Sequence, residues 1–223
     1  MNAPGSHTAV SAPVADRISL GAGAFLMRGF AAACDARLVS DLRRVLEEAP
    51  CRHMVTPGGF RMTVAMSNCG ALGWVSDDTG YRYDEIDPDS GRRWPTMPAS
   101  LVELAQRAAD QAGYRGFVPD ACLISRYLPG ARLTLHQDRD ERELDWPIVS
   151  ISLGLPAVFL FGGLKRSVKP VRVPLIHGDV VIWGGPSRLR YHGVLNLADG
   201  SHPLVGRYRF NLSLRRAGIS PRL

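Results

Sequence analysis

The sequence contains almost no lysine, because only Lys165 and Lys169 are found among its 27 basic residues. The formal net charge of +6 is therefore carried by arginine. An arginine-rich chain with an isoelectric point near 9.5 is compatible with a polyanionic partner. Charge alone does not establish such a partner, since modest positive charge is common in proteins that never bind nucleic acid.

Paired cysteine motifs are also missing. The four cysteines include no C-x-x-C pair, which argues against a zinc knuckle or a redox-active dithiol. We therefore expect reduced thiols and a cytoplasmic location. Residues 1–16 lack the positively charged start and the apolar core of a signal peptide, and we expect a flexible N-terminal tail there.

No uninterrupted hydrophobic run is long enough to cross a membrane. The most apolar stretch, residues 148–164, is broken by glycines and a proline. A composition of 45% hydrophobic and 22% charged residues is typical of a globular protein with a sizeable core, and it excludes disorder throughout. We expect one domain over residues 17–223, and a monomer because no long apolar stripe is left unassigned.

Two segments have helical periodicity, at residues 30–49 and 99–112. Apolar residues recur at helical spacing in both, Pro50 closes the first, and Pro98 and Gly113 bound the second. These helices are expected to buttress a sheet. Residues 56–98 are rich in Gly, Ser, Asp and Pro with scattered aromatics, which predicts irregular hairpins and surface loops.

Short strand-like runs follow Pro119 and predict a β-sandwich or barrel. The runs are residues 121–128, 132–136, 148–153, 157–161, 171–176, 180–183, 190–195 and 207–214. In the last run, apolar residues alternate with Arg209, Asn211, Ser213 and Arg215, which would share one polar face. Such a face is costly inside a small sandwich unless it lines a ligand site.

A His-x-Asp spacing occurs twice. His177 and Asp179 flank a glycine directly before an apolar strand, which favours a structural tight turn. His136 and Asp138 follow a strand-like run, and the pleat would point both side chains to one face, where they can bind one metal. The spacing by itself is weak evidence, because chance produces such pairs in a chain of this composition.

His192, in a later strand-like run, completes a set of two histidines and one carboxylate. This is the facial triad of non-haem Fe(II) oxygenases, although His192 considered alone would more simply be a core histidine. Arg209 and Arg215 are an even number of residues apart on one strand and can each hold a carboxylate. 2-Oxoglutarate needs such a cation for its far carboxylate, and the Tyr127 hydroxyl can assist.

Longer motifs extend this pattern. They are residues 54–59 (MVTPGG), 68–70 (NCG), 72–74 (LGW), 119–124 (PDACLI), 136–138 (HQD), 152–157 (SLGLPA), 177–181 (HGDVV), 183–185 (WGG) and 209–215 (RFNLSLR). With them, residues 55–217 resemble the AlkB-like Fe(II)/2-oxoglutarate dioxygenases, specifically the bacterial branch that repairs alkylated nucleobases. The resemblance implies a mainly β (α+β) fold: a double-stranded β-helix, or jelly roll, over residues 119–217, with N-terminal buttressing helices and a nucleotide-recognition lid over residues 56–98.

The resemblance also implies roles for individual residues. The implied iron ligands are His136, Asp138 and His192. The implied 2-oxoglutarate contacts are Ser125, Tyr127, Arg209, Asn211 and Arg215, with Arg215 near the metal-chelating end. The implied substrate contacts are Trp74, Tyr81, Tyr83, Asp140, Glu141 and Arg166. The family usually has asparagine where this chain has Ser125, which puts one co-substrate hydrogen bond in doubt.

The expected activity is oxidative demethylation of N-alkylated bases such as 1-methyladenine and 3-methylcytosine in single- or double-stranded DNA. It would use Fe(II), 2-oxoglutarate and O2 and release formaldehyde, succinate and CO2. Trp74 and the His136 ring can sandwich a flipped base, and Asp140 would favour a cationic one. The alternatives are the same chemistry on RNA, a protein or a small molecule, or a non-catalytic basic β-sandwich that binds nucleic acid.

Overall fold

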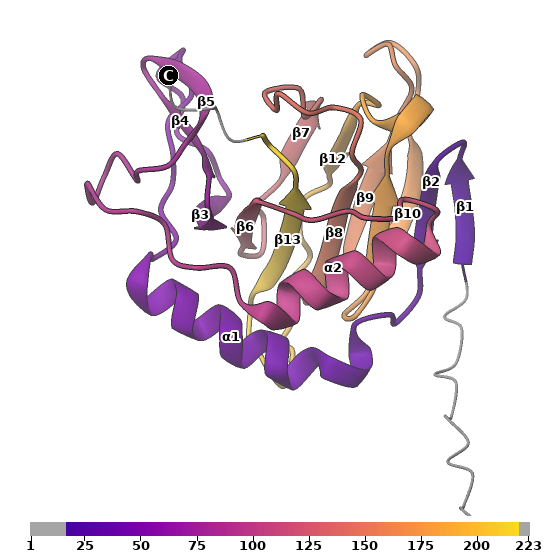
Figure 1. Ribbon diagram of the computed structural model, residues 1–223, viewed down its shortest axis with the longest axis horizontal. Helices are drawn as coiled ribbons and strands as arrows, with labels where there is room; N and C mark the ends of the chain where they lie inside the picture. The colour runs from indigo at the N-terminus through magenta and orange to yellow at the C-terminus, as the bar shows by residue number, and fades with distance from the viewer. Residues whose placement is uncertain (1–16, 219–223) are drawn as a thin grey trace, which may run out of the picture.

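A seven-stranded antiparallel sheet forms the centre of the fold in the computed structural model, which describes residues 17–218 (Figure 1). Its strands, in spatial order, are β1 (Arg17–Gly21), β2 (Ala24–Met27), β11 (Val180–Trp183), β8 (Ile148–Gly154), β13 (Arg209–Arg215), β6 (Ala121–Tyr127) and β3 (Ala65–Gly70). The predicted tail at residues 1–16 lies outside the described residues.

The two predicted helices lie side by side across one face of this sheet (Figure 1). They are α1 (Asp35–Glu48), preceded by the short helix η1 (Ala32–Cys34), and α2 (Ala99–Gln111). Their apolar stripes are buried with the outward-facing residues of β8 and β13, because each amphipathic helix presents one hydrophobic face. The predicted buttressing of the sheet is confirmed.

A four-stranded antiparallel sheet covers the opposite face of the large sheet. It runs in the order β10 (Val171–Leu175), β9 (Ala157–Phe161), β12 (His192–Val194) and β7 (Leu133–His136), and η2 (Gly185–Ser187) precedes β12. Apolar residues of both sheets form a second core between them. Two packed antiparallel sheets make a jelly roll, and the mainly β fold class is confirmed.

The segment 56–98 is more regular than expected. β4 (Gly73–Asp77) and β5 (Gly80–Asp84) form a separate two-stranded hairpin, as predicted for part of it. β3, however, is a buried edge strand of the large sheet and not a surface loop. The strands β1 and β2 were not predicted at all. Within residues 17–218, no helix is long and apolar enough to span a membrane.

Candidate active site

A cavity of about 790 Å³ opens between the two sheets. The polar residues of β13 line it, while Phe210, Leu212 and Leu214 face the helices. The predicted alternation along this strand is therefore confirmed, and the polar face is accommodated because it faces a cavity and not an apolar core. The small sheet supplies the opposite wall through β7, β9 and β12.

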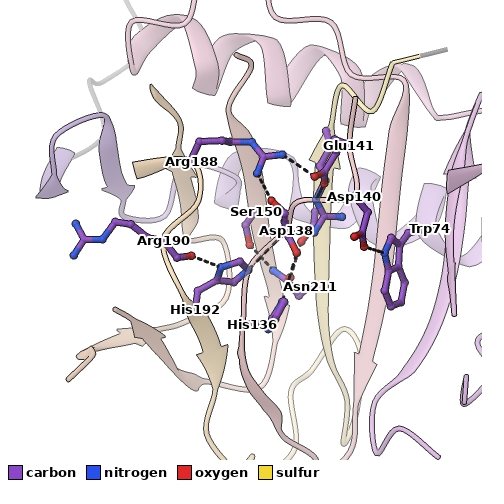
Figure 2. A network of polar contacts seen from close by, with 12 residues as sticks. Trp74, His136, Asp138, Asp140, Glu141, Ser150, Arg188, Arg190, His192 and Asn211 are labelled. Atoms are coloured by element: carbon purple, nitrogen blue, oxygen red, sulfur yellow. Dashed lines mark hydrogen bonds and ion pairs between the residues drawn. The ribbon is translucent and has the colours of Figure 1, made fainter. Parts of the chain in front are cut away.

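His136, Asp138 and His192 come together in this cavity (Figure 2). His136 ends β7 and His192 begins β12, and the two histidines are directly paired across the strands. Nε2 of His136 lies 3.5 Å and Nε2 of His192 lies 3.6 Å from the carboxylate oxygens of Asp138. The three candidate ligand atoms all lie within 4.8 Å of one another, which suits a single metal ion.

Hydrogen bonds fix which nitrogen each histidine turns toward the carboxylate. Nδ1 of His136 is 2.9 Å from the Thr134 carbonyl oxygen, and Nδ1 of His192 is 3.0 Å from that of Arg190. A carbonyl oxygen only accepts, so each Nδ1 carries a proton and donates it, and Nε2 is the nitrogen turned toward the carboxylate. Both rings are thus oriented as metal ligands.

Electrostatics favours the ligand protonation states. Burial, and then the neighbouring His192, lower the pKa of His136 to about 4. Burial alone would raise the pKa of Asp138, but Arg215 and then His192 outweigh it and hold that pKa well below its usual range. At neutral pH His136 is neutral and Asp138 is ionised. Two imidazoles and one carboxylate are the donor set that Fe(II) takes in this class of site, so the residues fit the metal.

Arg209 is a buried cation in the same cavity, and no carboxylate within ion-pair distance of it is found among residues 17–218. Its side chain is only 1% exposed, and Nε and Nη1 find no hydrogen-bond partner among residues 17–218. Nη2 donates to the Ser152 hydroxyl at 3.2 Å, and the guanidinium lies 5.1 Å from the Tyr127 ring. Since an unpaired buried charge is costly, the site fits a small anion such as the far carboxylate of 2-oxoglutarate.

The other predicted co-substrate residues lie beside Arg209. Ser125, Tyr127 and Asn211 line the cavity from the neighbouring strands β6 and β13, where Asn211 is paired with Ser125. The Asn211 amide donates to the Ser150 hydroxyl at 2.7 Å and to the Ile151 carbonyl at 3.2 Å. Asn211 is thereby held in one orientation, with its carbonyl oxygen accepting from Ser213 at 3.0 Å.

Arg215, at the other end of β13, is ion-paired with two protein carboxylates, in contrast to Arg209. Its Nη2 donates to Asp138, and its Nε lies 3.2 Å from a carboxylate oxygen of Glu141. Burial would lower the pKa of Arg215, but Asp138, Tyr83 and Glu141 together raise it. Arg215 therefore lies beside the metal ligand, and its charge is neutralised by protein carboxylates.

The predicted substrate residues divide into two groups. Trp74 and Tyr81 of the hairpin stack on each other with ring centroids 5.6 Å apart, and Trp74 Nε1 donates to Asp140 at 2.8 Å at the mouth of the cavity (Figure 2). Glu141 and Tyr83 face inward. The Tyr83 hydroxyl donates to Glu141 at 2.9 Å, and the Glu141 side chain is only 1% exposed.

Arginines that line the cavity mouth differ from three other arginines on or beside the hairpin. Arg52, Arg82 and Arg93 are ion-paired with acidic neighbours. No such partner is found in residues 17–218 for the exposed arginines that line the mouth, which are Arg61, Arg132, Arg139 and Arg166. The Arg166 guanidinium instead lies 5.9 Å from the Tyr191 ring. Positive charge at this rim is thus available to an external anion.

Sequence reasoning missed Arg188, which is 3% exposed behind the triad. It donates to the backbone carbonyls of Asp138 at 2.7 Å and Trp146 at 3.1 Å, and its Nη2 lies 3.1 Å from Glu141. No pattern distinguishes Arg188 from nearby Arg190, because its partners depend on how the loop after β7 folds back. Only its short distance from His192 in the sequence could have drawn attention to it.

Comparisons with known proteins agree with this site. The profile of the 2OG-Fe(II) oxygenase superfamily matches residues 23–215. The alpha-ketoglutarate-dependent dioxygenase AlkB of Escherichia coli (strain K12) is 56% identical over 199 residues, which cover 89% of this chain and 92% of that protein. The AlkB homolog of Caulobacter vibrioides (strain NA1000 / CB15N) is 46% identical over 172 residues, covering 77% of this chain and 76% of that protein. The solved structure of OsALKBH1 matches with a TM-score of 0.79 at 26% identity, covering 90% of this chain and 100% of that one.

The fold, the triad and the buried cation define an Fe(II)- and 2-oxoglutarate-dependent dioxygenase. The chain belongs to the 2OG-Fe(II) oxygenase superfamily, within its AlkB-like bacterial branch.

Proposed function

We propose that this dioxygenase removes methyl groups from N-alkylated bases in DNA, with 1-methyladenine and 3-methylcytosine as the type substrates. The observation that carries the proposal is the aromatic wall of Trp74 and Tyr81, joined to Asp140, at the mouth of the cavity that holds the triad. A flat wall suits a base taken out of its stack, and a carboxylate beside it favours a base that methylation has made cationic.

Some residues of the cavity would hold the reactants, and others set the charge around them. His136, Asp138 and His192 would hold the iron, and Arg209 would hold the far carboxylate of 2-oxoglutarate. Iron, 2-oxoglutarate and dioxygen supply the oxidation of the alkyl carbon, with succinate, CO2 and formaldehyde as products. Trp74 and Asp140 orient the base so that its alkyl group faces the metal.

The free arginines at the rim support a nucleic-acid substrate. Arg61 and Arg166 are exposed at the cavity mouth, where they can neutralise phosphates on either side of a flipped nucleotide. Relatives carry names that fit, such as the nucleic acid dioxygenase ALKBH1 of mouse, 34% identical over 124 residues. We expect single- or double-stranded DNA as substrate, RNA as the alternative, a monomeric enzyme and a cytoplasmic location.

The decisive measurement is mass spectrometry of a short single-stranded DNA carrying one 1-methyladenine, incubated with protein, Fe(II), ascorbate and 2-oxoglutarate. We expect loss of one methyl group with the unaltered protein and none with His136→Ala. An RNA oligonucleotide of the same sequence and a duplex serve as parallel arms. An unchanged oligonucleotide in every arm, together with continued consumption of 2-oxoglutarate, would refute the substrate and leave the dioxygenase chemistry standing.

The salt dependence of DNA binding tests whether the arginines at the rim contact phosphates. Arg61→Ala and Arg166→Ala should weaken DNA binding and reduce its salt dependence by roughly one counterion each. Arg92→Ala is the matched control, because Arg92 is exposed on the same segment but lines no part of the cavity. Equal effects of all three substitutions would show that the rim is not the path of the phosphate backbone.

A further inference from the structure

The loop that follows β7 connects the metal ligand to the base-facing hairpin at two points. Asp138 is the carboxylate of the triad, Asp140 accepts the hydrogen bond of Trp74 on β4, and Glu141 accepts that of Tyr83 on β5. Trp74 and Tyr83 are directly paired across the hairpin. Both strands of the hairpin are thus attached to residues 138–141, a segment of the loop after β7 that begins with a metal ligand.

Glu141 is the centre of these attachments. One of its oxygens accepts from Tyr83 at 2.9 Å and lies 3.2 Å from Arg215 Nε, and the other lies 3.1 Å from Arg188 Nη2. The contacts with the two arginines are within ion-pair distance but are not aligned as hydrogen bonds, so charge holds them. The Glu141 carboxylate thus lies between two buried guanidiniums and gives each of them a buried counter-charge.

Arg188 ties the same loop to the segment that carries His192. Its three contacts are with the Asp138 carbonyl, the Glu141 carboxylate and the Trp146 carbonyl, all on the loop after β7. Figure 2 shows the contacts with Asp138 and Glu141. Gln137 adds a hydrogen bond of 2.5 Å to the Leu189 carbonyl. The ligand-bearing loop is therefore fixed both to the second histidine and to the hairpin.

We propose that Glu141 and Arg188 are positioning residues that set Asp138 for metal binding, and that Glu141 couples this ligand to the base-facing hairpin through Tyr83. A base held against Trp74 and a metal held by Asp138 then favour the same placement of the loop. Binding at either place strengthens binding at the other by the same factor, as linkage requires. The first half rests on the metal site alone, and the coupling rests also on the proposed nucleic-acid substrate.

The positioning half is tested without nucleic acid or turnover. Co²⁺ replaces Fe(II) as a probe, and its visible absorption bands report both affinity and coordination geometry. Glu141→Gln and Arg188→Met should weaken Co²⁺ binding by about tenfold to a hundredfold and alter the bands, as loss of groups that orient metal ligands does. Arg188→Lys, which can satisfy only part of the three contacts, should give an intermediate dissociation constant.

Arg28→Met is the matched control. Arg28 makes a 2.5 Å ion pair with the buried Asp179, and neither residue lines the cavity, so its loss lowers stability without touching the metal loop. Co²⁺ affinity within about twofold of the unaltered protein for folded Glu141→Gln and Arg188→Met would overturn the positioning role. So would an equal loss of affinity in Arg28→Met, because that would trace the effect to general destabilisation.

The coupling half uses Tyr83→Phe, which removes one hydroxyl and preserves the ring, so it remains informative if a charged variant fails to fold. Co²⁺ affinity is measured with and without a 1-methyladenine trinucleotide. In the unaltered protein we expect the trinucleotide to tighten Co²⁺ binding at least about fivefold, and in Tyr83→Phe by less than about twofold. The same factor in both proteins would overturn the coupling. A trinucleotide that fails to bind the unaltered protein would refute the coupling and the proposed substrate, but not the positioning role.

Discussion

The two His-x-Asp segments have the same residue spacing but different roles, because one forms a structural turn and the other belongs to the candidate metal site. In the His177–Asp179 turn the polar side-chain atoms are bonded within the protein: His177 Nδ1 accepts from Gly154 N at 2.9 Å, and its Nε2 lies 3.0 Å from Asp35. Asp179 accepts from Gly29 N and Ile176 N at 3.0 Å each and pairs with Arg28. At the triad, by contrast, each histidine bonds backbone through Nδ1 only.

The difference shows that a metal site depends on which histidine nitrogens have no hydrogen-bond partner within the protein. His136 and His192 each keep Nε2 free because a carbonyl takes Nδ1, whereas His177 has both nitrogens occupied. The local backbone causes this contrast. His136 and His192 face each other across paired strands, while Gly178, with a φ of +84°, makes a tight turn that folds Asp179 back onto its own backbone.

The largest expected effect comes from making the same Asp→Asn substitution in each of the two segments and comparing the results. Asp138→Asn removes the ligand charge and should weaken Fe(II) or Co²⁺ binding by more than about a hundredfold, beyond what loss of an outer partner costs. Asp179→Asn should leave metal affinity unchanged. Metal titration of both variants at a temperature where both are folded is the measurement, and a similar loss of affinity in the two would remove the distinction drawn between the segments.

Arg209→Met, in the cavity that holds the triad, should have opposite effects on stability and on binding of 2-oxoglutarate. The substitution removes a buried cation with unsatisfied atoms, so the free energy of unfolding of the protein without ligands should rise by about 1–3 kcal/mol. The stabilisation that added 2-oxoglutarate gives to the unaltered protein should disappear. Thermal unfolding with and without 2-oxoglutarate checks both effects, and a variant that is still stabilised by 2-oxoglutarate would contradict the assignment of Arg209 to the far carboxylate.

In the His177–Asp179 turn, by contrast, removing a charge should lower the stability of the protein. Asp179 is completely buried and accepts two backbone hydrogen bonds and an arginine, so Asp179→Asn leaves Arg28 unpaired and offers one acceptor oxygen fewer. We expect a loss of about 2–4 kcal/mol in the free energy of unfolding. Urea denaturation measures it. A loss below about 0.5 kcal/mol would mean that this turn does not contribute to stability as its contacts indicate.

The sequence predicts the second half of the chain better than the first. Every strand-like run after Pro119 is a strand in the structure, within about two residues at its ends, because alternation and turn residues are local signals. β3 was missed because both its faces are buried and no alternation remains. β1 and β2 are short, and no strand was predicted at either place.

The site shows the same division. The side chains on β13 follow from alternation alone, and the motifs locate the triad. The inward orientation of Glu141 could not be predicted, because it depends on Arg188 and Arg215, which approach from distant parts of the chain. An acidic side chain beside the metal ligand is equally consistent in sequence with a substrate contact and with a buried ion pair.

A smaller effect should follow from restoring the family's asparagine beside the co-substrate. Ser125 is buried, lines the cavity and is paired with Asn211 across β6 and β13. Ser125→Asn adds an amide donor toward the space next to Arg209 and should lower the KM for 2-oxoglutarate about threefold to tenfold, the worth of one hydrogen bond. Initial rates at varied 2-oxoglutarate measure this, and an increase in KM would show that the serine leaves no room for the amide.

The smallest expected effect concerns pH and His202, which stacks on His177 with ring centroids 4.2 Å apart. Burial, and then His177, lower the pKa of His202, with Asp35 opposing. As pH falls, His202 is therefore protonated in the unfolded chain at a higher pH than in the folded protein. The contribution of His202 to stability is complete above pH about 6.5 and is lost as pH falls from there toward the folded-state pKa. His202→Asn, whose amide oxygen can still accept from Leu204 N, should flatten that loss. Urea denaturation between pH about 5 and about 7.5 measures the slope, and an unchanged slope would place the acid sensitivity outside this histidine pair.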